Sequence, residues 1–232
     1  MYAIIPAREG SKSIPRKNIY PICGRPLISY SIESCKLCKN IDRIIVSTDG
    51  EEIAEISKKY GAEIPFMRPK EYATDESSDI DYLRHFFENI ETNEVALLRP
   101  TTPLRDHSVM SGVIEIYYEN KDEMSGLRTA QEVNQPAHKM FKKVGNYFEG
   151  FFSDFNGIKD YTNLPRQIFP KTYSPNGYID IIKRKTVEGG SVFGDKIFAC
   201  VTERISDVDS TDDIKFLEFE VGQRHSETFR EF

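Results

Sequence analysis

Short apolar runs alternate with segments of helical periodicity along the first 120 residues, and this alternation constrains the fold more than any other feature. Buried-strand patterns occupy residues 2–5 (YAII), 43–48 (RIIVST), 62–67 (AEIPFM) and 94–100 (EVALLRP). Apolar side chains at helical spacing span about 26–38, 51–60, 78–91 and 107–119. Strands joined by helices form right-handed crossovers. We therefore expect a three-layer, Rossmann-like α/β fold with a mostly parallel central sheet.

The second half of the chain departs from this pattern. Residues 138–152 (HKMFKKVGNYFEGFF) alternate like a β-hairpin, and the following segment is rich in proline and aromatic residues. Strand patterns return at 178–182 and 196–201, and 210–220 reads as a capped final helix. We expect one domain over residues 1–220, a lid or dimerisation excursion at 130–175, and a C-terminal tail at 221–232.

Composition excludes several classes of protein. The net charge of −6 argues against nucleic-acid binding, which requires a basic surface. No stretch reaches the ~20 apolar residues of a membrane span, and the apolar start is too short for a signal peptide. We expect a cytoplasmic protein that binds neither nucleic acid nor membrane. Cys35 and Cys38 form a C-x-x-C without a second metal-binding pair, which favours structural thiols.

The loop after the first strand carries an unusual density of positive charge. Residues 6–18 (PAREGSKSIPRKN) contain Arg8, Lys12, Arg16 and Lys17 against a single glutamate. Gly10 allows backbone amides to face an anion, as in phosphate-binding loops. A solvated basic turn is the alternative. Ligands of doubly wound sheets bind beyond the carboxyl ends of the strands, so this position favours phosphate binding.

Two aspartates near the other end of the chain, Asp207 and Asp209, form a D-x-D pair. In an extended segment both side chains point to the same face. Carboxylate oxygens suit a hard cation such as Mg²⁺. A helix N-terminus is the alternative, because acids there are favoured by capping and by the helix dipole. That alternative accounts for Asp212 and Asp213 better than for the earlier pair.

Seven motifs in order resemble the acylneuraminate cytidylyltransferases, which make CMP-sialic acid and the related CMP-legionaminate and CMP-pseudaminate. They are IIPAREGSKSIPRKN, STDG, FMRPKEYATDESS, LLRPTTPLR, LPRQ, SPNGYIDI and DVDSTDD. The resemblance runs from the first strand to about residue 218. It implies a nucleotidyltransferase fold and a homodimer, in which a sugar hydroxyl attacks the α-phosphate of CTP and pyrophosphate leaves.

The resemblance also implies roles for individual residues. The nucleotide-binding set is Arg8, Ser11, Lys12, Lys17, Asn18, Arg68, Ser77 and Ser78. The set implied for the acidic sugar is Arg99, Lys139, Arg166, Asn176 and Tyr178. Asp207 and Asp209 would bind Mg²⁺, and with Arg8, Lys12 and Lys17 they form the implied catalytic set. Positioning and charge neutralisation of this kind are what phosphoryl transfer requires.

Arg99 departs from the family pattern. Members that use sialic acid have LQPTSPLR, with a glutamine facing the sugar, where this chain has LRPTTPLR. Arg99 either attracts an extra anionic group on the acceptor or turns away to pair with an acid. The alternatives for the whole chain are a transferase for 3-deoxy-manno-octulosonate or an amino-sugar 1-phosphate, with CTP or another nucleotide, and a nucleotide-binding protein without catalysis.

Overall fold

The computed structural model of the chain describes residues 1–228, with side chains described to residue 223. Seven strands form the central sheet in the order β11-β6-β10-β5-β1-β4, with β9 also paired to β6. They are β1 Tyr2–Pro6, β4 Arg43–Ser47, β5 Glu94–Leu97, β6 Gly126–Val133, β9 Thr172–Pro175, β10 Asp180–Lys183 and β11 Ile197–Val201.

The sheet is mixed, which refines the expectation of a mostly parallel one. Strand β1 runs parallel to β4 and β5, and β11 runs parallel to β6, whereas β10 runs antiparallel to both β5 and β6. Strands β9 and β10 pair with successive parts of β6, so these three segments form one long hairpin. Antiparallel strands need no crossover helix, and the pattern of helical crossovers therefore ends at this hairpin.

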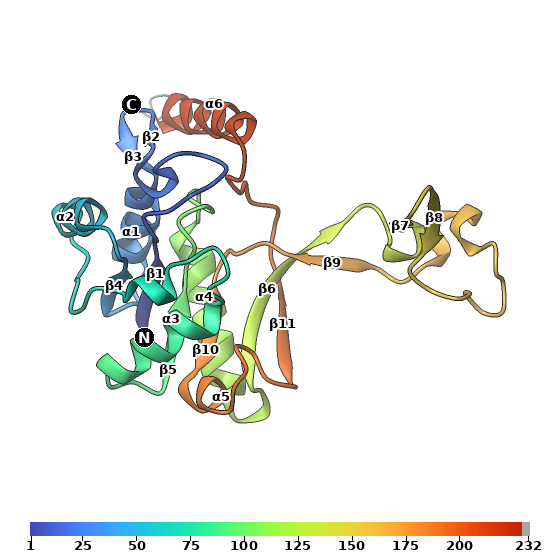
Figure 1. The fold of residues 1–232 in the computed structure, drawn as a ribbon, viewed down its shortest axis with the longest axis horizontal. Helices are drawn as coiled ribbons and strands as arrows, with labels where there is room; N and C mark the ends of the chain where they lie inside the picture. The colour runs from blue at the N-terminus through green and yellow to red at the C-terminus, as the bar shows by residue number, and fades with distance from the viewer. Residues whose placement is uncertain (229–232) are drawn as a thin grey trace.

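Helices cover both faces of the sheet and confirm the α/β class. Along β1, Ala3 and Ile5 pack into a cluster with α1, α2 and α4, whereas Ile4 packs on the opposite face with α3 and α5. Alternation of this kind is the strand period of two. Figure 1 shows these layers. The helices are α1 Leu27–Leu37, α2 Glu51–Lys59, α3 Asp79–Asn89, α4 His107–Asn120, α5 Arg184–Glu188 and α6 Thr211–Thr228.

Shorter elements fill the connections. The small strands β2 (Pro21–Ile22) and β3 (Arg25–Pro26) form a hairpin before α1. Short 3-10 helices occur at Lys17–Ile19, Lys70–Tyr72, Lys121–Glu123, Ala137–Lys139, Tyr161–Asn163 and Arg166–Ile168. In the described part of the chain, no helix combines the length and the apolar content needed to cross a bilayer.

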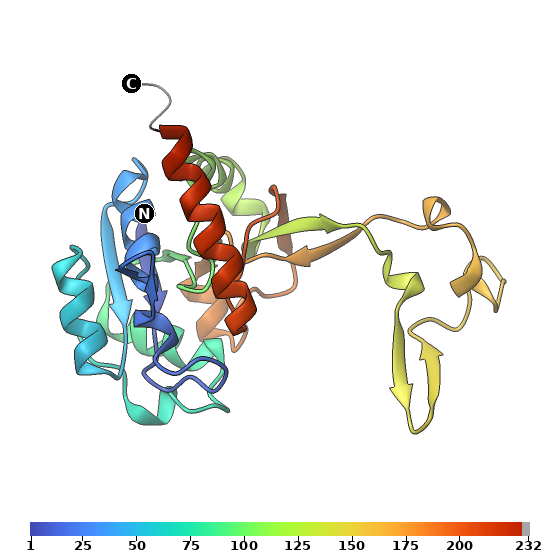
Figure 2. The same ribbon diagram turned by 90° about the horizontal axis from the view of Figure 1, so that it is seen from above.

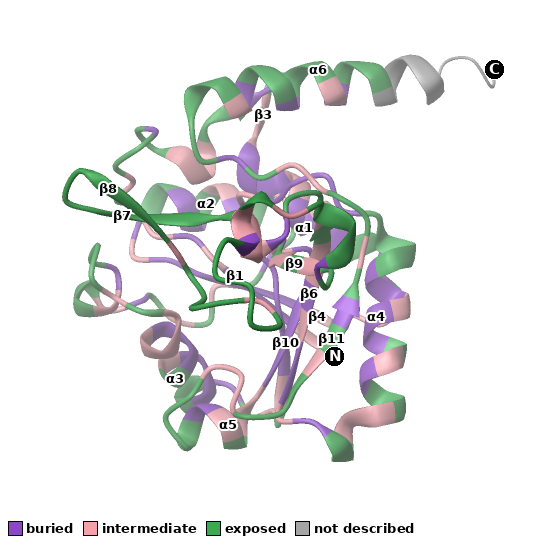
Figure 3. Ribbon diagram, turned by 90° about the vertical axis from the view of Figure 1, so that its right-hand side faces the viewer, coloured by how far each residue is buried: buried purple, intermediate pink, exposed green. Residues whose placement is uncertain are grey.

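Residues 134–171, which we call the arm, project away from the sheet (Figures 1 and 2). The arm carries the expected hairpin, with β7 at Phe141–Val144 and β8 at Tyr147–Gly150. It has a small aromatic cluster of its own, in which the His138 ring stacks between Phe152 and Phe169 at 4.3 and 5.0 Å. Figure 3 shows the hairpin exposed, whereas strands at the centre of the sheet such as β10 are buried.

Two expected boundaries were wrong. The helix α6 continues to Thr228, past the predicted start of a tail at 221, because Val221 extends the buried stripe of Ile214 and Leu217. Residues 229–232 of that tail lie outside the described residues. At 62–67 the expected strand is reduced to a single bridge between Ile45 and Glu63. Pro65 has no amide hydrogen with which to continue the pairing.

Candidate active site

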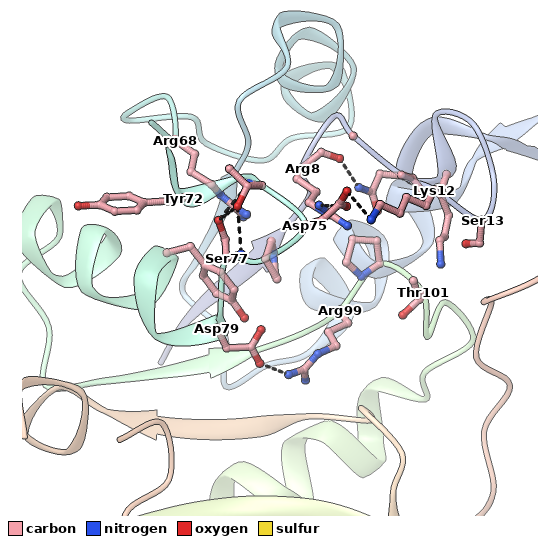
Figure 4. Close-up of a pocket in the computed structure, with 18 residues that line it drawn as sticks. Arg8, Lys12, Ser13, Arg68, Tyr72, Asp75, Ser77, Asp79, Arg99 and Thr101 are labelled. Atoms are coloured by element: carbon pink, nitrogen blue, oxygen red, sulfur yellow. Dashed lines mark hydrogen bonds and ion pairs between the residues drawn. The ribbon is translucent and has the colours of Figure 1, made fainter. Parts of the chain in front are cut away.

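A cleft of about 390 Å³ lies at the carboxyl ends of β1, β4 and β5. Three segments line it: the basic loop after β1, the 68–82 segment that leads from α2 into α3, and the start of the 99–105 loop after β5. Figure 4 shows side chains from all three pointing into it. Seven of the eight expected nucleotide-binding residues line it, and Ser78 is the exception. Ser78 instead caps the N-terminus of α3, where its amide donates to Asp81 Oδ2 at 2.7 Å.

Buried contacts and hydrogen bonds fix the conformation of the basic loop. Ile14, only 1% exposed, anchors it in a cluster with Ile22 and Val208. Asn18 Nδ2 donates to the carbonyl of Arg8 at 2.8 Å, so this amide shapes the loop. Lys12 extends into solvent, whereas Lys17 is mostly buried. The cations therefore line the cleft from a fixed backbone.

Asp75, which the sequence reasoning missed, sits opposite this loop. Its two carboxylate oxygens lie 2.8 Å from Arg8 Nη1 and from Lys12 Nζ. These two contacts hold the pKa of Asp75 below its ordinary value, Lys12 acting most strongly. The turn that carries Asp75 is closed by Ser77, whose hydroxyl accepts from the Thr74 amide at 3.0 Å. An acid inside the motif FMRPKEYATDESS was the signal that could have identified it.

The D-x-D segment borders the same cleft. Asp207 and Asp209 are exposed on either side of the buried Val208, as an extended segment requires. The Val208 amide donates to the Thr101 carbonyl at 2.8 Å, and Lys17 Nζ lies 3.1 Å from Asp209 Oδ1. Both Lys17 and Thr101 line the cleft. Residues from the two ends of the chain therefore meet at one site.

These two aspartates fit a magnesium ion. Mg²⁺ is commonly held by one or two protein carboxylates, with phosphate oxygens and water completing its shell. Among the described residues no group of three or more His, Cys, Asp or Glu side chains is arranged to hold a metal by itself. The helix-capping alternative applies instead to Asp213, which accepts from the Ser210 hydroxyl and amide at 2.7 Å each, contacts that lower its pKa.

Arg68 is positioned by the end of β4. Its Nε and Nη2 donate to the hydroxyl and carbonyl of Ser47 at 3.0 and 2.7 Å, and its guanidinium lies over the Tyr82 ring at 4.8 Å. The side chain is buried, which lowers the pKa of its guanidinium. Arg68 therefore lines the cleft in a fixed position.

Arg99 lines the cleft and also pairs with acids. Its guanidinium contacts Asp79 at the start of α3, and its Nη1 lies 3.2 Å from Asp180 Oδ2 in β10. The carboxylate of Asp180 is almost fully buried and accepts from the Thr129 amide at 3.1 Å. Arg99 therefore pairs with acids, as the second reading expected, but it also faces the cleft.

The other four residues implied for the sugar lie outside this cleft. Lys139 and Arg166 are in the arm, where Lys139 Nζ donates to the Thr162 carbonyl at 3.1 Å. Asn176 Nδ2 donates to Thr202 Oγ1 at 2.7 Å. Tyr178 accepts from the Asp106 amide at 2.7 Å and lines a separate cavity of about 270 Å³. Their role in binding a sugar stays a prediction.

Arg105 is a second residue that the sequence reasoning missed. It is 5% exposed, and it donates to Ser31 Oγ at 2.9 Å and to the carbonyls of Arg99 and Gly177 at 2.8 Å each. It also donates to the Tyr178 carbonyl. Burial lowers its pKa to about 10. Arg105 therefore ties the 99–105 loop to the turn before β10 and to α1.

The cysteines do not contribute to the site. All four are free thiols, and Cys35 and Cys38 are buried in the apolar cluster around α1 and α4. Burial raises the pKa of the Cys35 thiol to about 12. A thiol that stays protonated is a poor nucleophile, which agrees with a structural role.

Comparison of the chain with known proteins identifies its family. The cytidylyltransferase family model matches residues 2–149. The chain is 28% identical to a pseudaminic acid cytidylyltransferase of Campylobacter jejuni subsp. jejuni serotype O:2, over 97% of this chain and 98% of the relative. It is 30% identical to an N-acylneuraminate cytidylyltransferase of Escherichia coli O18:K1:H7, over 92% of this chain but only 50% of that longer protein.

A solved structure agrees on the fold. The CMP:2-keto-3-deoxy-manno-octonic acid synthetase complexed with CTP superposes with a TM-score of 0.73, at 15% identity, over 96% of this chain and 98% of that one. The family match covers β1, the basic loop and the strands β4 and β5 that form the cleft. The chain therefore belongs to the cytidylyltransferase family and is a nucleotidyltransferase.

Proposed function

We propose that this protein transfers CMP from CTP to an acidic nine-carbon sugar of the sialic, legionaminic or pseudaminic acid type. A sugar hydroxyl would form the new bond to the α-phosphorus as the bond to the β-phosphate oxygen breaks, so that CMP-sugar and pyrophosphate result. The observation that carries the proposal is the meeting of the basic loop and the D-x-D segment through Lys17 and Asp209, 3.1 Å apart.

The residues around the cleft have distinct parts in this reaction. Arg8, Lys12 and Lys17 would neutralise the charge of the triphosphate, with Ser11 and the loop amides as further donors. Arg68, Ser77 and Asn18 would shape the nucleotide pocket. Asp207 and Asp209 would hold Mg²⁺, which when bound neutralises developing charge on the phosphates. Positioning and electrostatics of this kind suffice for phosphoryl transfer, and no covalent intermediate is needed.

A pyrophosphate-release screen tests the proposal. The purified protein is assayed with Mg²⁺, the four nucleoside triphosphates, the three nine-carbon acids, 3-deoxy-manno-octulosonate and an amino-sugar 1-phosphate. We expect release only with CTP and a nine-carbon acid. Release with a sugar 1-phosphate or another nucleotide would favour a different transferase. Binding of CTP with no release from any acceptor would favour a nucleotide-binding protein.

We infer that the active form is a homodimer, because Lys139 and Arg166 lie in the arm and away from the cleft of their own chain. The arm hairpin also leaves Tyr147 and Phe148 at 78% and 74% exposure. Adjacent exposed aromatic side chains are typical of a protein interface. A second copy of the chain would cover them and bring the two cations toward its cleft.

Replacing both Tyr147 and Phe148 with serine should produce a monomer in sedimentation velocity. Phe216→Ser is the matched control, because Phe216 is an exposed aromatic residue on α6, away from the arm. It should leave the oligomeric state unchanged. An unaltered sedimentation coefficient for the double variant, with wild type dimeric, would exclude the hairpin as the interface.

Asp75→Asn should tighten CTP binding severalfold. In the free protein Asp75 neutralises Arg8 and Lys12, the cations proposed to receive the triphosphate, so the nucleotide must compete with this carboxylate. Asparagine removes the competing charge with little change in size. Calorimetric titration with CTP measures the effect, and Glu76→Gln, an exposed neighbour in the same turn, is the charge-matched control. Weaker binding by Asp75→Asn would show instead that Asp75 prepares the two cations for the nucleotide.

A further inference from the structure

Three residues from distant parts of the chain form an ion-pair cluster at one side of the cleft. Arg99 follows β5, Asp79 begins α3 and Asp180 begins β10. We call these residues the Arg99 cluster. Figure 4 shows Arg99 and Asp79 joined on one side of the cleft, with Arg8, Asp75 and Lys12 on another. The cleft therefore contains two electrostatically different regions.

The Arg99 cluster has no surplus positive charge. One guanidinium faces two carboxylates, so with both ionised the cluster is net negative. Burial raises the pKa of Asp180, and with that group protonated the cluster would be neutral. In neither protonation state does it offer a free cation. This differs from the basic loop, where Arg8 and Lys12 share the single carboxylate of Asp75.

Arg99 is also unable to leave its partners easily. The side chain of Asp180 is 2% exposed, and removing Arg99 would leave this buried carboxylate without its ion pair, although the Thr129 amide would still donate to it at 3.1 Å. Uncompensated buried charges are strongly unfavourable. Asp79, in contrast, is 37% exposed and lines the cleft. An incoming group therefore meets the guanidinium and the Asp79 carboxylate side by side.

This arrangement determines which chemical groups fit. A hydroxyl or an amide can donate to a carboxylate and accept from a guanidinium at the same time. A phosphate ester can only accept, and it would lie against the negative charge of Asp79. Like charges brought together at a binding site are unfavourable and are a common source of specificity.

We propose, on the basis of the function proposed above, that the Arg99 cluster selects acceptor sugars that present a neutral hydroxyl or N-acyl group at this side of the cleft. Acceptors with a second anionic group there, such as a phosphate ester, are rejected. Arg99 and Asp79 are then specificity-determining residues. The arginine that replaces the family's glutamine acts as part of a compensated pair and does not attract an extra anion.

The test compares two acceptors that differ by one phosphate, N-acetylneuraminic acid and its 9-phosphate. The readout is the ratio of kcat/KM values for pyrophosphate release. Wild type should prefer the unphosphorylated acceptor by roughly tenfold or more, and Asp79→Asn should reduce that ratio by roughly tenfold, mainly through KM of the phosphorylated acceptor. Glu88→Gln removes one exposed charge from the same helix and should leave the ratio unchanged.

Arg99→Gln distinguishes a compensated Arg99 from one that attracts an anion, because the two readings predict opposite changes in the ratio of kcat/KM values. If Arg99 belongs to a compensated cluster, the variant should reject the phosphorylated acceptor more strongly than wild type. If Arg99 attracts an anion, wild type would prefer the phosphorylated acceptor and the variant would lose that preference, which would overturn the proposal. An unchanged ratio in Asp79→Asn, with CTP affinity retained, would overturn it as well. No release from wild type with any acceptor would instead contradict the proposed function.

Discussion

Asp209→Ala is expected to reduce pyrophosphate release by roughly a hundredfold or more, the largest activity change among the variants considered. A bound metal contributes several kcal/mol to charge stabilisation in phosphoryl transfer, and each 1.4 kcal/mol corresponds to a factor of ten. Asp209 is exposed and contacts Lys17 and the start of α6. The variant should therefore fold normally, with a circular dichroism spectrum like that of wild type.

The matched control for Asp209→Ala is Asp212→Ala. Asp212 lies three residues later on the first turn of α6 and pairs with the exposed Lys215 at 2.9 Å. It should retain turnover. The affinity for CTP without Mg²⁺ is a second readout, which separates an effect on metal binding from an effect on nucleotide binding. Asp209→Ala should bind CTP without Mg²⁺ at least as well as wild type, because Lys17 loses its carboxylate partner. Near-normal turnover of Asp209→Ala would exclude this aspartate as a metal ligand.

Arg105→Met is expected to lower the free energy of unfolding by about 3 kcal/mol, the largest stability change among these variants. Methionine fills much of the arginine volume but has no N–H groups. The carbonyls of Arg99 and Gly177 and the hydroxyl of Ser31 then lose buried donors that now lie 2.8–2.9 Å away. Unsatisfied buried acceptors of this kind are costly.

Urea denaturation followed by circular dichroism measures the effect of Arg105→Met. Arg84→Met, at an exposed position on α3, is the control and should change stability little. Arg105→Lys should fall between the two, because lysine keeps the charge but cannot reproduce the guanidinium fork. Equal stabilities for Arg105→Met and Arg84→Met would show that the four contacts of Arg105 contribute nothing net to the fold.

Much of the site could be predicted because it depends on local patterns. Apolar periodicity identified β1, β4 and β5, and in a parallel arrangement their carboxyl ends must meet at one edge. Arg8, Lys12 and Lys17 therefore had to lie near Arg68 and Arg99, as the cleft confirms. The expectation for α6 failed only in its length, although the spacing of Ile214, Leu217 and Val221 was visible in the sequence.

The partners of those cations could not be predicted in the same way. Asp75 lies 67 residues from Arg8, and Asp180 lies 81 residues from Arg99. The chain has many acidic residues, and its sequence did not indicate which of them would pair with each arginine. Which one is used depends on the placement of α3 and on β10 entering the sheet next to β5, with Asp180 opposite Leu97. Strand β10 runs antiparallel to β5 because it belongs to the long hairpin with β6.

The sequence by itself determined the α/β class, the basic character of the loop after β1 and the resemblance to the family, because periodicity, local charge and motifs are properties of neighbouring residues. Only the tertiary structure decided that the D-x-D segment meets Lys17, that Arg105 is a buried donor to four groups, and that Arg99 is compensated by Asp79 and Asp180. Ion pairs and buried hydrogen bonds depend on distances of a few ångströms between residues far apart in the chain, and packing sets those distances.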